Sequence, residues 1–151
     1  MEQFSGSGVS VGAVFGKIAA FGPDESEPEK RIAADFDREL TRLSMALEQA
    51  KSELEKLYEE AIDKVGEENA LIFDIHKMML EDLDYIDNIE NLIKEEKVTA
   101  EYAVLETGKQ FSKLFADMDD DYMRARSVDV IDISKRVIRK LTGKEENKLK
   151  S

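Results

Sequence analysis

Few residues in this sequence could carry out chemistry. His76 is the only histidine and there is no cysteine, so a histidine metal pair, a histidine relay and thiolate chemistry are all excluded. A lone histidine in a helical segment is more often a structural residue or an interface contact than a catalytic one. The sequence therefore favours recognition over catalysis.

Two other patterns have ordinary structural explanations. Gly6, Gly8 and Gly12 follow a GxGxxxG spacing, which is not the dinucleotide fingerprint, and they fit strands and turns better. Asp117 and residues 119–121 form an acidic cluster without the glycine and terminal glutamate that an EF-hand loop requires. We interpret this cluster as the start of a helix, where negative charge is favourable.

Residues 67–96 are more informative, because they contain ten acidic residues against two basic ones. A solvated helix face explains part of this excess. Met78, Met79 and Tyr85 share the same segment, however, which indicates a mixed apolar and acidic surface. Methionine adapts to a partner surface and the charge would steer a basic partner. A protein-binding face and a solvated face are equally good interpretations at this point.

The composition supports a folded, acidic protein. Hydrophobic residues make up 42% of the 151 residues, charged residues make up 37%, and the formal net charge is −12. This charge disfavours nucleic acid and anionic membranes as partners. There is no readable signal peptide or membrane-spanning run, so we expect a soluble, cytoplasmic protein.

The elements that position these residues are predicted from glycine, proline and apolar spacing. Residues 1–22 hold five of the eight glycines and predict one or two short strands. Residues 23–31 contain both prolines and predict a linker. We expect a helical domain over residues 32–143 and a flexible polar tail over residues 144–151.

Apolar residues in steps of three and four predict about five helices in the helical domain. They should run over residues 32–65, 67–81 and 83–95, then from an N-cap at Thr99, and last from the acidic cluster to Gly143. Gly66 should end the long first helix, and Gly108 should permit a close helix crossing. The predicted fold class is mainly α, a helical bundle of paired antiparallel hairpins with a short N-terminal β appendage.

Three motifs resemble the N-terminal part of Enzyme I of the bacterial phosphotransferase system. Residues 66–82, GEENALIFDIHKMMLED, are similar to the family stretch GEE…IFxxHxxMLED. Residues 119–130, DDDYMRARSVDV, resemble DDEYLRERAxDV, and residues 134–143, SKRVIRKLTG, resemble GKRVLRxLLG. The order of the Gly-rich start and the long helix also matches, so the resemblance covers nearly the whole chain.

The resemblance implies a helical domain that docks the phosphocarrier protein HPr, whose surface around its active histidine is basic. The docking residues implied by the motifs are Glu67, Glu68, His76, Met78, Met79, Asp82, Phe115, Met123, Arg126 and Asp129. The four apolar residues would form the centre and acidic residues the rim. Arg126 would face an acidic partner group or the phosphate. Departures from the family pattern at Ser127, Val128 and Ile131 affect partner specificity rather than fold.

The family's phosphoryl-accepting histidine lies in a downstream Gly-Gly-x-Thr-Ser-His motif, and its phosphoenolpyruvate barrel binds Mg²⁺. Neither is in this sequence, so we expect a fragment or an early-terminating homologue that has no cofactor of its own and is inactive alone. Residues 4–21 would then lack their partner strands, so we expect them to be disordered, to fold as a lone hairpin or to pair with a neighbouring chain. Charge reversal at Glu68 and Asp82 should slow HPr association more than it disturbs folding.

Two alternatives stay open. One is a standalone adaptor of the nitrogen-related branch that binds a different HPr-like carrier. The other is a structural coiled-coil protein that self-associates through the apolar stripe of residues 32–65.

Overall fold

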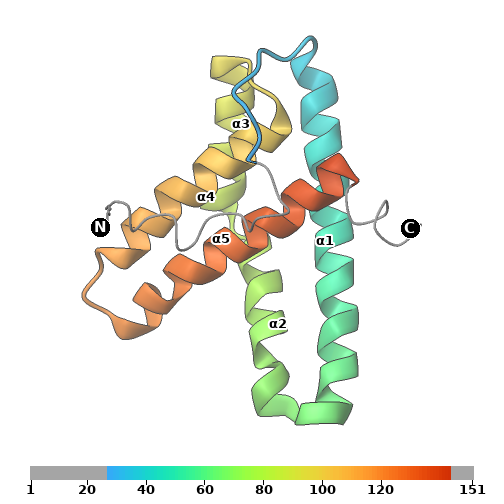
Figure 1. Cartoon of the computed structure of the whole chain (residues 1–151), viewed down its shortest axis with the longest axis vertical. Coiled ribbons are helices and arrows are strands. Elements are labelled where there is room, and N and C mark those ends of the chain that lie inside the picture. Colours follow the sequence, from blue (N-terminus) through green and yellow to red (C-terminus); the bar gives the residue numbers. More distant parts are fainter. Residues whose placement is uncertain (1–26, 144–151) are drawn as a thin grey trace, which may run out of the picture.

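The computed structural model describes residues 27–143, which form five helices joined by short connections (Figure 1). The helices are α1 (Phe36–Val65), α2 (Glu67–Leu80), α3 (Leu83–Glu96), α4 (Ala100–Ala116) and α5 (Asp121–Thr142). α1 and α2 form one antiparallel hairpin, and α4 and α5 form a second that crosses it (Figure 1). The predicted bundle of paired hairpins is confirmed.

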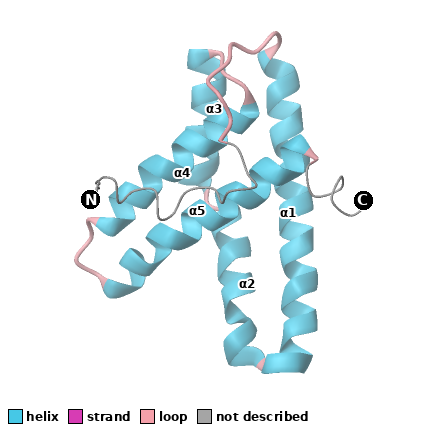
Figure 2. Ribbon diagram, in the orientation of Figure 1, coloured by secondary structure: helices cyan, strands magenta, loops and turns pink. Residues whose placement is uncertain are grey.

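Residues 27–143 contain no strand (Figure 2). The β appendage predicted over residues 1–22 and the tail predicted over residues 144–151 both lie outside the described residues. The suggested pairing of residues 4–21 with another chain lies outside them as well.

The first helix begins later than predicted, at Phe36 rather than Ile32. Asp35 has extended backbone angles and its carboxylate accepts hydrogen bonds from the amides of Asp37 and Arg38, which makes it the N-cap. Ile32 instead forms an isolated antiparallel bridge with Val98, and its side chain is 74% exposed. The apolar spacing misplaced this boundary because Ile32 happened to continue the helical period of α1.

The other helix ends agree with the sequence signals. The Thr99 hydroxyl accepts a hydrogen bond from the amide of Tyr102 at 3.4 Å, and the Asp120 carboxylate accepts one from the amide of Tyr122 at 3.0 Å. Gly66 and Gly143 follow α1 and α5 with φ of 87° and 73°, which are angles that favour glycine. These caps set the lengths of the helices and therefore the positions of the turns.

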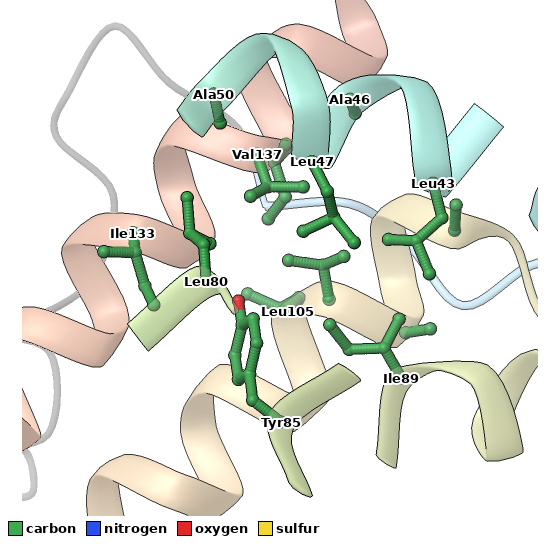
Figure 3. Close-up of a cluster of buried hydrophobic side chains, with 14 of the residues drawn as sticks. Leu43, Ala46, Leu47, Ala50, Leu80, Tyr85, Ile89, Leu105, Ile133 and Val137 are labelled. Atoms are coloured by element: carbon green, nitrogen blue, oxygen red, sulfur yellow. The ribbon is translucent and has the colours of Figure 1, made fainter. Parts of the chain in front are cut away.

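The core lies where the two hairpins cross (Figure 3). The middle of α1 contributes Leu43, Leu47, Ala50 and Leu54, each at most 6% exposed. Side chains from α2 to α5 cover them, so this part of the α1 stripe is already buried within one chain. That packing leaves the middle of the stripe unavailable to a second chain, which counts against the coiled-coil alternative.

Gly108 on α4 permits the close approach of α5 that was predicted for it. A Cβ atom at Gly108 would lie 2.6 Å from the Ser134 hydroxyl oxygen and 3.0 Å from the Ser134 Cβ. That hydroxyl lies 2.7 Å from the phenol oxygen of Tyr85 and donates to the Val130 carbonyl at 2.7 Å. The missing side chain at position 108 therefore makes room for a buried bond between α3 and α5.

The Gly108→Ala variant should lose about 1–2 kcal/mol of unfolding free energy. Overpacking costs about 1–3 kcal/mol, and the better helix propensity of alanine offsets at most about 1 kcal/mol of it. Urea unfolding would measure the loss. It should shrink in a Ser134→Gly background, which removes the atoms that clash.

Gly66→Ala provides the matched control, because nothing lies within 4 Å of a Cβ there and only the positive φ opposes alanine. The loss of unfolding free energy caused by Gly66→Ala should be the same with and without the Ser134→Gly substitution. An equal loss for Gly108→Ala in both backgrounds would show that the helix crossing is not the cause.

Candidate functional site

The ten predicted docking residues are spread over α2, the N-cap of α3, the end of α4 and the first half of α5. Glu67 and Glu68 begin α2, and His76, Met78 and Met79 lie in its second half. Asp82 caps α3, Phe115 lies in the last turn of α4, and Met123, Arg126 and Asp129 lie in α5. Sequence segments separated by more than 50 residues are therefore joined through the contact of α2 with α5.

Three of the ten residues are in direct contact at that crossing. His76 Nε2 lies 3.1 Å from Asp129 Oδ1, and Arg126 Nε lies 2.8 Å from Asp129 Oδ2. Their side chains are only 11–13% exposed. The Arg126 guanidinium also lies 4.5 Å from the centre of the Tyr122 ring, which stacks a cation on an exposed aromatic face.

Asp82 has a structural role in addition to its predicted position at the rim of the docking surface. Its carboxylate accepts hydrogen bonds from the amides of Asp84 at 2.8 Å and Tyr85 at 3.2 Å, which makes it the N-cap of α3. Removing such a cap costs about 1 kcal/mol. Charge reversal at Asp82 would therefore disturb folding as well as association, so it is a poorer test of docking than charge reversal at Glu68, which caps no helix.

Glu67 and Glu68 are exposed in the first turn of α2. Their negative charge favours the helix dipole there. About nine residues of helix separate them from His76, or roughly 14 Å at 1.5 Å per residue. The acidic end and the arginine end of the candidate surface are therefore distinct regions.

The apolar residues of the predicted centre differ in exposure. Met78 is 61% exposed, whereas Met79 is half-buried against the core. Phe115 is half-buried too, and its ring meets Phe111 edge-on, with ring centres 5.9 Å apart. Met123 is half-buried. Met78 is thus the member of this set with the most surface to offer a partner.

Tyr85 does not belong to the mixed surface to which the sequence assigned it. It is 2% exposed and sits inside the core cluster, where Figure 3 shows it among Leu80, Leu105 and Ile89. The Ser134 hydroxyl satisfies its phenol group, so the polar atom can be buried. Burial raises the pKa of Tyr85, and the hydrogen bond with Ser134 opposes that rise only in part.

The sequence reasoning missed four exposed side chains around the predicted site. They are Leu71 at 45%, Ile72 at 36%, Leu83 at 71% and Tyr122 at 58%. Leu83 could have been found, because it falls off the stripe of Tyr85, Ile89 and Ile93 that α3 buries. Leu71 and Ile72 could not, because they fit the apolar period of α2 and only the structure shows that they are exposed.

The described residues show no group of three or more histidine, aspartate or glutamate side chains arranged to hold a metal ion. Among them, no helix is both long enough and apolar enough to cross a membrane.

Comparison with known proteins gives the family. Residues 5–126 match the family model described as PEP-utilising enzyme, N-terminal. The phosphoenolpyruvate-protein phosphotransferase of Geobacillus stearothermophilus is 38% identical over 142 residues, and that of Bacillus subtilis is 33% identical over 145 residues. These alignments cover 94% and 96% of this chain, but the chain spans only about a quarter (25%) of the length of each relative.

Two solved structures share the fold. A solution structure of an Enzyme I protein, nEIt, has a TM-score of 0.73 at 33% identity, over 79% of this chain and 49% of that one. An N-terminal domain of Enzyme 1 – Nitrogen has a TM-score of 0.73 at 25% identity, over 82% and 52%. Since the family model and these relatives align with most of the chain, the protein belongs to the PEP-utilising enzyme N-terminal family, and its helices are those of the N-terminal domain of Enzyme I.

Proposed function

We propose that this helical domain docks HPr, the phosphocarrier protein of the phosphotransferase system. One observation carries the proposal: the segment from residue 67 to residue 84 exposes large apolar side chains among acidic ones. Leu71, Ile72, Met78 and Leu83 are 36–71% exposed, and Glu67, Glu68, Glu81, Asp82 and Asp84 are exposed around them.

This composition suits a basic partner with an apolar centre. Exposed apolar side chains supply the buried contact area of an interface, and the surrounding charges steer a partner of opposite sign. The net charge of −12 extends the same attraction over the molecule. In the family that this chain resembles, HPr presents a basic surface around its active histidine, which matches both requirements.

A carrier of the nitrogen-related branch is the second candidate. The likeness to the N-terminal domain of Enzyme 1 – Nitrogen, with the same TM-score as the other solved structure, favours keeping it. We rank it second because the sequence identity to that structure is 25%, against 33% for the Enzyme I protein.

Titration of the isotope-labelled chain with HPr tests the proposal. We expect amide NMR shifts in residues 67–84 and 115–129 and little change in the middle of α1. Binding should be tighter at about 0.01 M salt than at about 0.1 M, because the Debye length falls from about 30 Å to about 10 Å. A nitrogen-related carrier added in competition should displace HPr only weakly.

Absence of binding at about 0.01 M salt would contradict the proposal, since electrostatic attraction is strongest there. Shifts confined to the outer face of α1 would contradict it as well. Tighter binding of the nitrogen-related carrier would select the second candidate.

A further inference from the structure

The His76, Asp129 and Arg126 group is buried too deeply for all three residues to act as docking contacts. His76 and Asp129 are each 9% exposed, which leaves a partner little surface to touch. Both carboxylate oxygens of Asp129 point at residues of the same chain, one to His76 at 3.1 Å and one to Arg126 at 2.8 Å. Any influence of His76 on docking must therefore pass through a neighbour.

Arg126 is the suitable neighbour, because it is the one cation among the ten predicted docking residues. Its side chain is 12% exposed, and its guanidinium lies 4.5 Å from the centre of the ring of Tyr122, which is 58% exposed and connects the group with the surface. A long arginine side chain that stays mobile loses conformational entropy when it binds, and fixing it beforehand reduces that loss. Asp129 and Tyr122 together fix it.

The guanidinium also keeps unused hydrogen-bonding capacity. Within the described part of the chain, Arg126 Nε and Nη1 are buried and meet no acceptor with hydrogen-bond geometry, although the Asp129 carboxylate lies close to Nε. Arginine carries five N–H donors in a fork that matches an oxygen acceptor. The chain itself does not satisfy these buried donors, so an acceptor oxygen from a docked partner would offset the cost of burying them.

We infer that His76 is a positioning residue for Arg126: it orients the Asp129 carboxylate, which holds the guanidinium for an acceptor oxygen of the docked partner. This inference rests on the proposed docking function. It assigns to His76 and Asp129 a supporting role beneath the surface and leaves the contact itself to Arg126. A purely structural role, in which His76 only ties α2 to α5, makes different predictions.

A double-mutant cycle in HPr binding separates the two roles. The His76→Leu variant should bind HPr about tenfold more weakly, a typical loss for an important interface residue. In an Arg126→Met background the same substitution should change binding little, because the residue through which it acts is already gone. His76→Gln, whose amide can donate to Asp129, should retain most of the binding. A tenfold loss that persists in the Arg126→Met background would overturn the inference.

A second measurement tests positioning without any partner. In the free chain, Arg126 Nε is buried 2.8 Å from Asp129 Oδ2, so its N–H should exchange slowly with solvent in NMR spectra, and His76→Leu should abolish this protection. Asp129→Asn should do the same, which keeps the test usable if one variant fails to fold. A signal that stays protected in both variants would overturn the inference whatever HPr does.

The binding cycle and the NMR measurement together distinguish failure of the docking proposal from failure of the positioning role of His76. If the wild-type chain does not bind HPr but the Arg126 signal depends on His76, the docking proposal fails and the positioning role of His76 stands. If HPr binds and the signal does not depend on His76, the docking proposal stands and the positioning role fails.

Discussion

Replacing Arg42 with methionine should lower the unfolding free energy by about 2–4 kcal/mol, somewhat less than the about 3–5 kcal/mol that removing one partner of a fully buried ion pair costs. Arg42 Nη1 lies 2.8 Å from Glu39 Oε1, and Nη2 lies 2.6 Å from Glu101 Oε2. Nη2 also donates to the Leu141 carbonyl at 3.3 Å. One side chain on α1 thus joins α4 and α5, and urea unfolding with an unchanged m-value would measure its loss.

The size of this loss of unfolding free energy follows from the two carboxylates that would remain unpaired. Glu39 and Glu101 would keep two largely buried negative charges without their cation, with side chains 10% and 17% exposed. Glu39 would also still accept a hydrogen bond from the amide of Ala100 at 2.8 Å, at the start of α4. The Arg42 side chain is 29% exposed, so solvent screens part of the effect and the upper end of the range is not expected.

The pKa of Arg42 agrees with this account. The hydrogen bond with Glu101 raises it, and burial lowers it by less. The charged form is therefore the form that the fold stabilises.

Arg38→Met is the matched control, because Arg38 is an exposed arginine four residues earlier on the same helix. The Arg38→Met variant should lose less than about 0.5 kcal/mol of unfolding free energy. The triple variant Arg42→Met, Glu39→Gln, Glu101→Gln should recover part of the loss by removing the unpaired charges. If Arg42→Met is no less stable than Arg38→Met, the three-helix contact contributes nothing to stability.

Reversing the charge of both Glu67 and Glu68 to lysine should slow association with HPr about tenfold or more at low salt. Each substitution replaces −1 with +1, so the net charge changes by 4, from −12 to −8. The change falls at the end of α2 that lies in the proposed docking surface, where it acts on steering more than on the dissociation rate. Stopped-flow association at about 0.01 M and about 0.1 M salt would measure it, and the difference should narrow as salt increases.

Glu59→Lys with Glu60→Lys supplies the control, because these are also adjacent exposed glutamates and change the net charge equally. Both glutamates lie on α1, outside the proposed docking surface. Their replacement by lysine should therefore slow association with HPr much less. Unfolding should be measured too, since losing negative charge from the first turn of α2 costs about 0.3–1 kcal/mol per residue. Equal slowing by both pairs would show that net charge, and not this surface, steers HPr.

Most of the fold was predictable because its signals are local. The caps at Thr99 and Asp120 and the glycines after α1 and α5 need only a few neighbouring residues to act. The apolar period does the same over a whole helix. It failed at Ile32 because a bridge with Val98, 66 residues later in the chain, takes that residue out of the helix.

The candidate site was predictable only as a set of residues, and the resemblance to Enzyme I named that set. The sequence did not predict which of these residues are exposed to a partner and which are buried or have a structural role. Burial of His76 and Asp129, the exposure of Leu83 and the N-cap role of Asp82 all depend on where α2, α3 and α5 meet. No local pattern encodes that meeting point.

The sequence by itself determined five amphipathic helices, their caps, an acidic surface and the family resemblance, because each of these depends on residue type and short-range spacing. Only the tertiary structure decided which polar groups are exposed and which are paired. Tyr85 is buried because Gly108 lets Ser134 reach it, and His76 is buried because α5 brings Asp129 to it. The physical reason is that a buried polar group is stable only beside a partner, and these partners lie about 50 residues away in the chain, 49 for Tyr85 and 53 for His76.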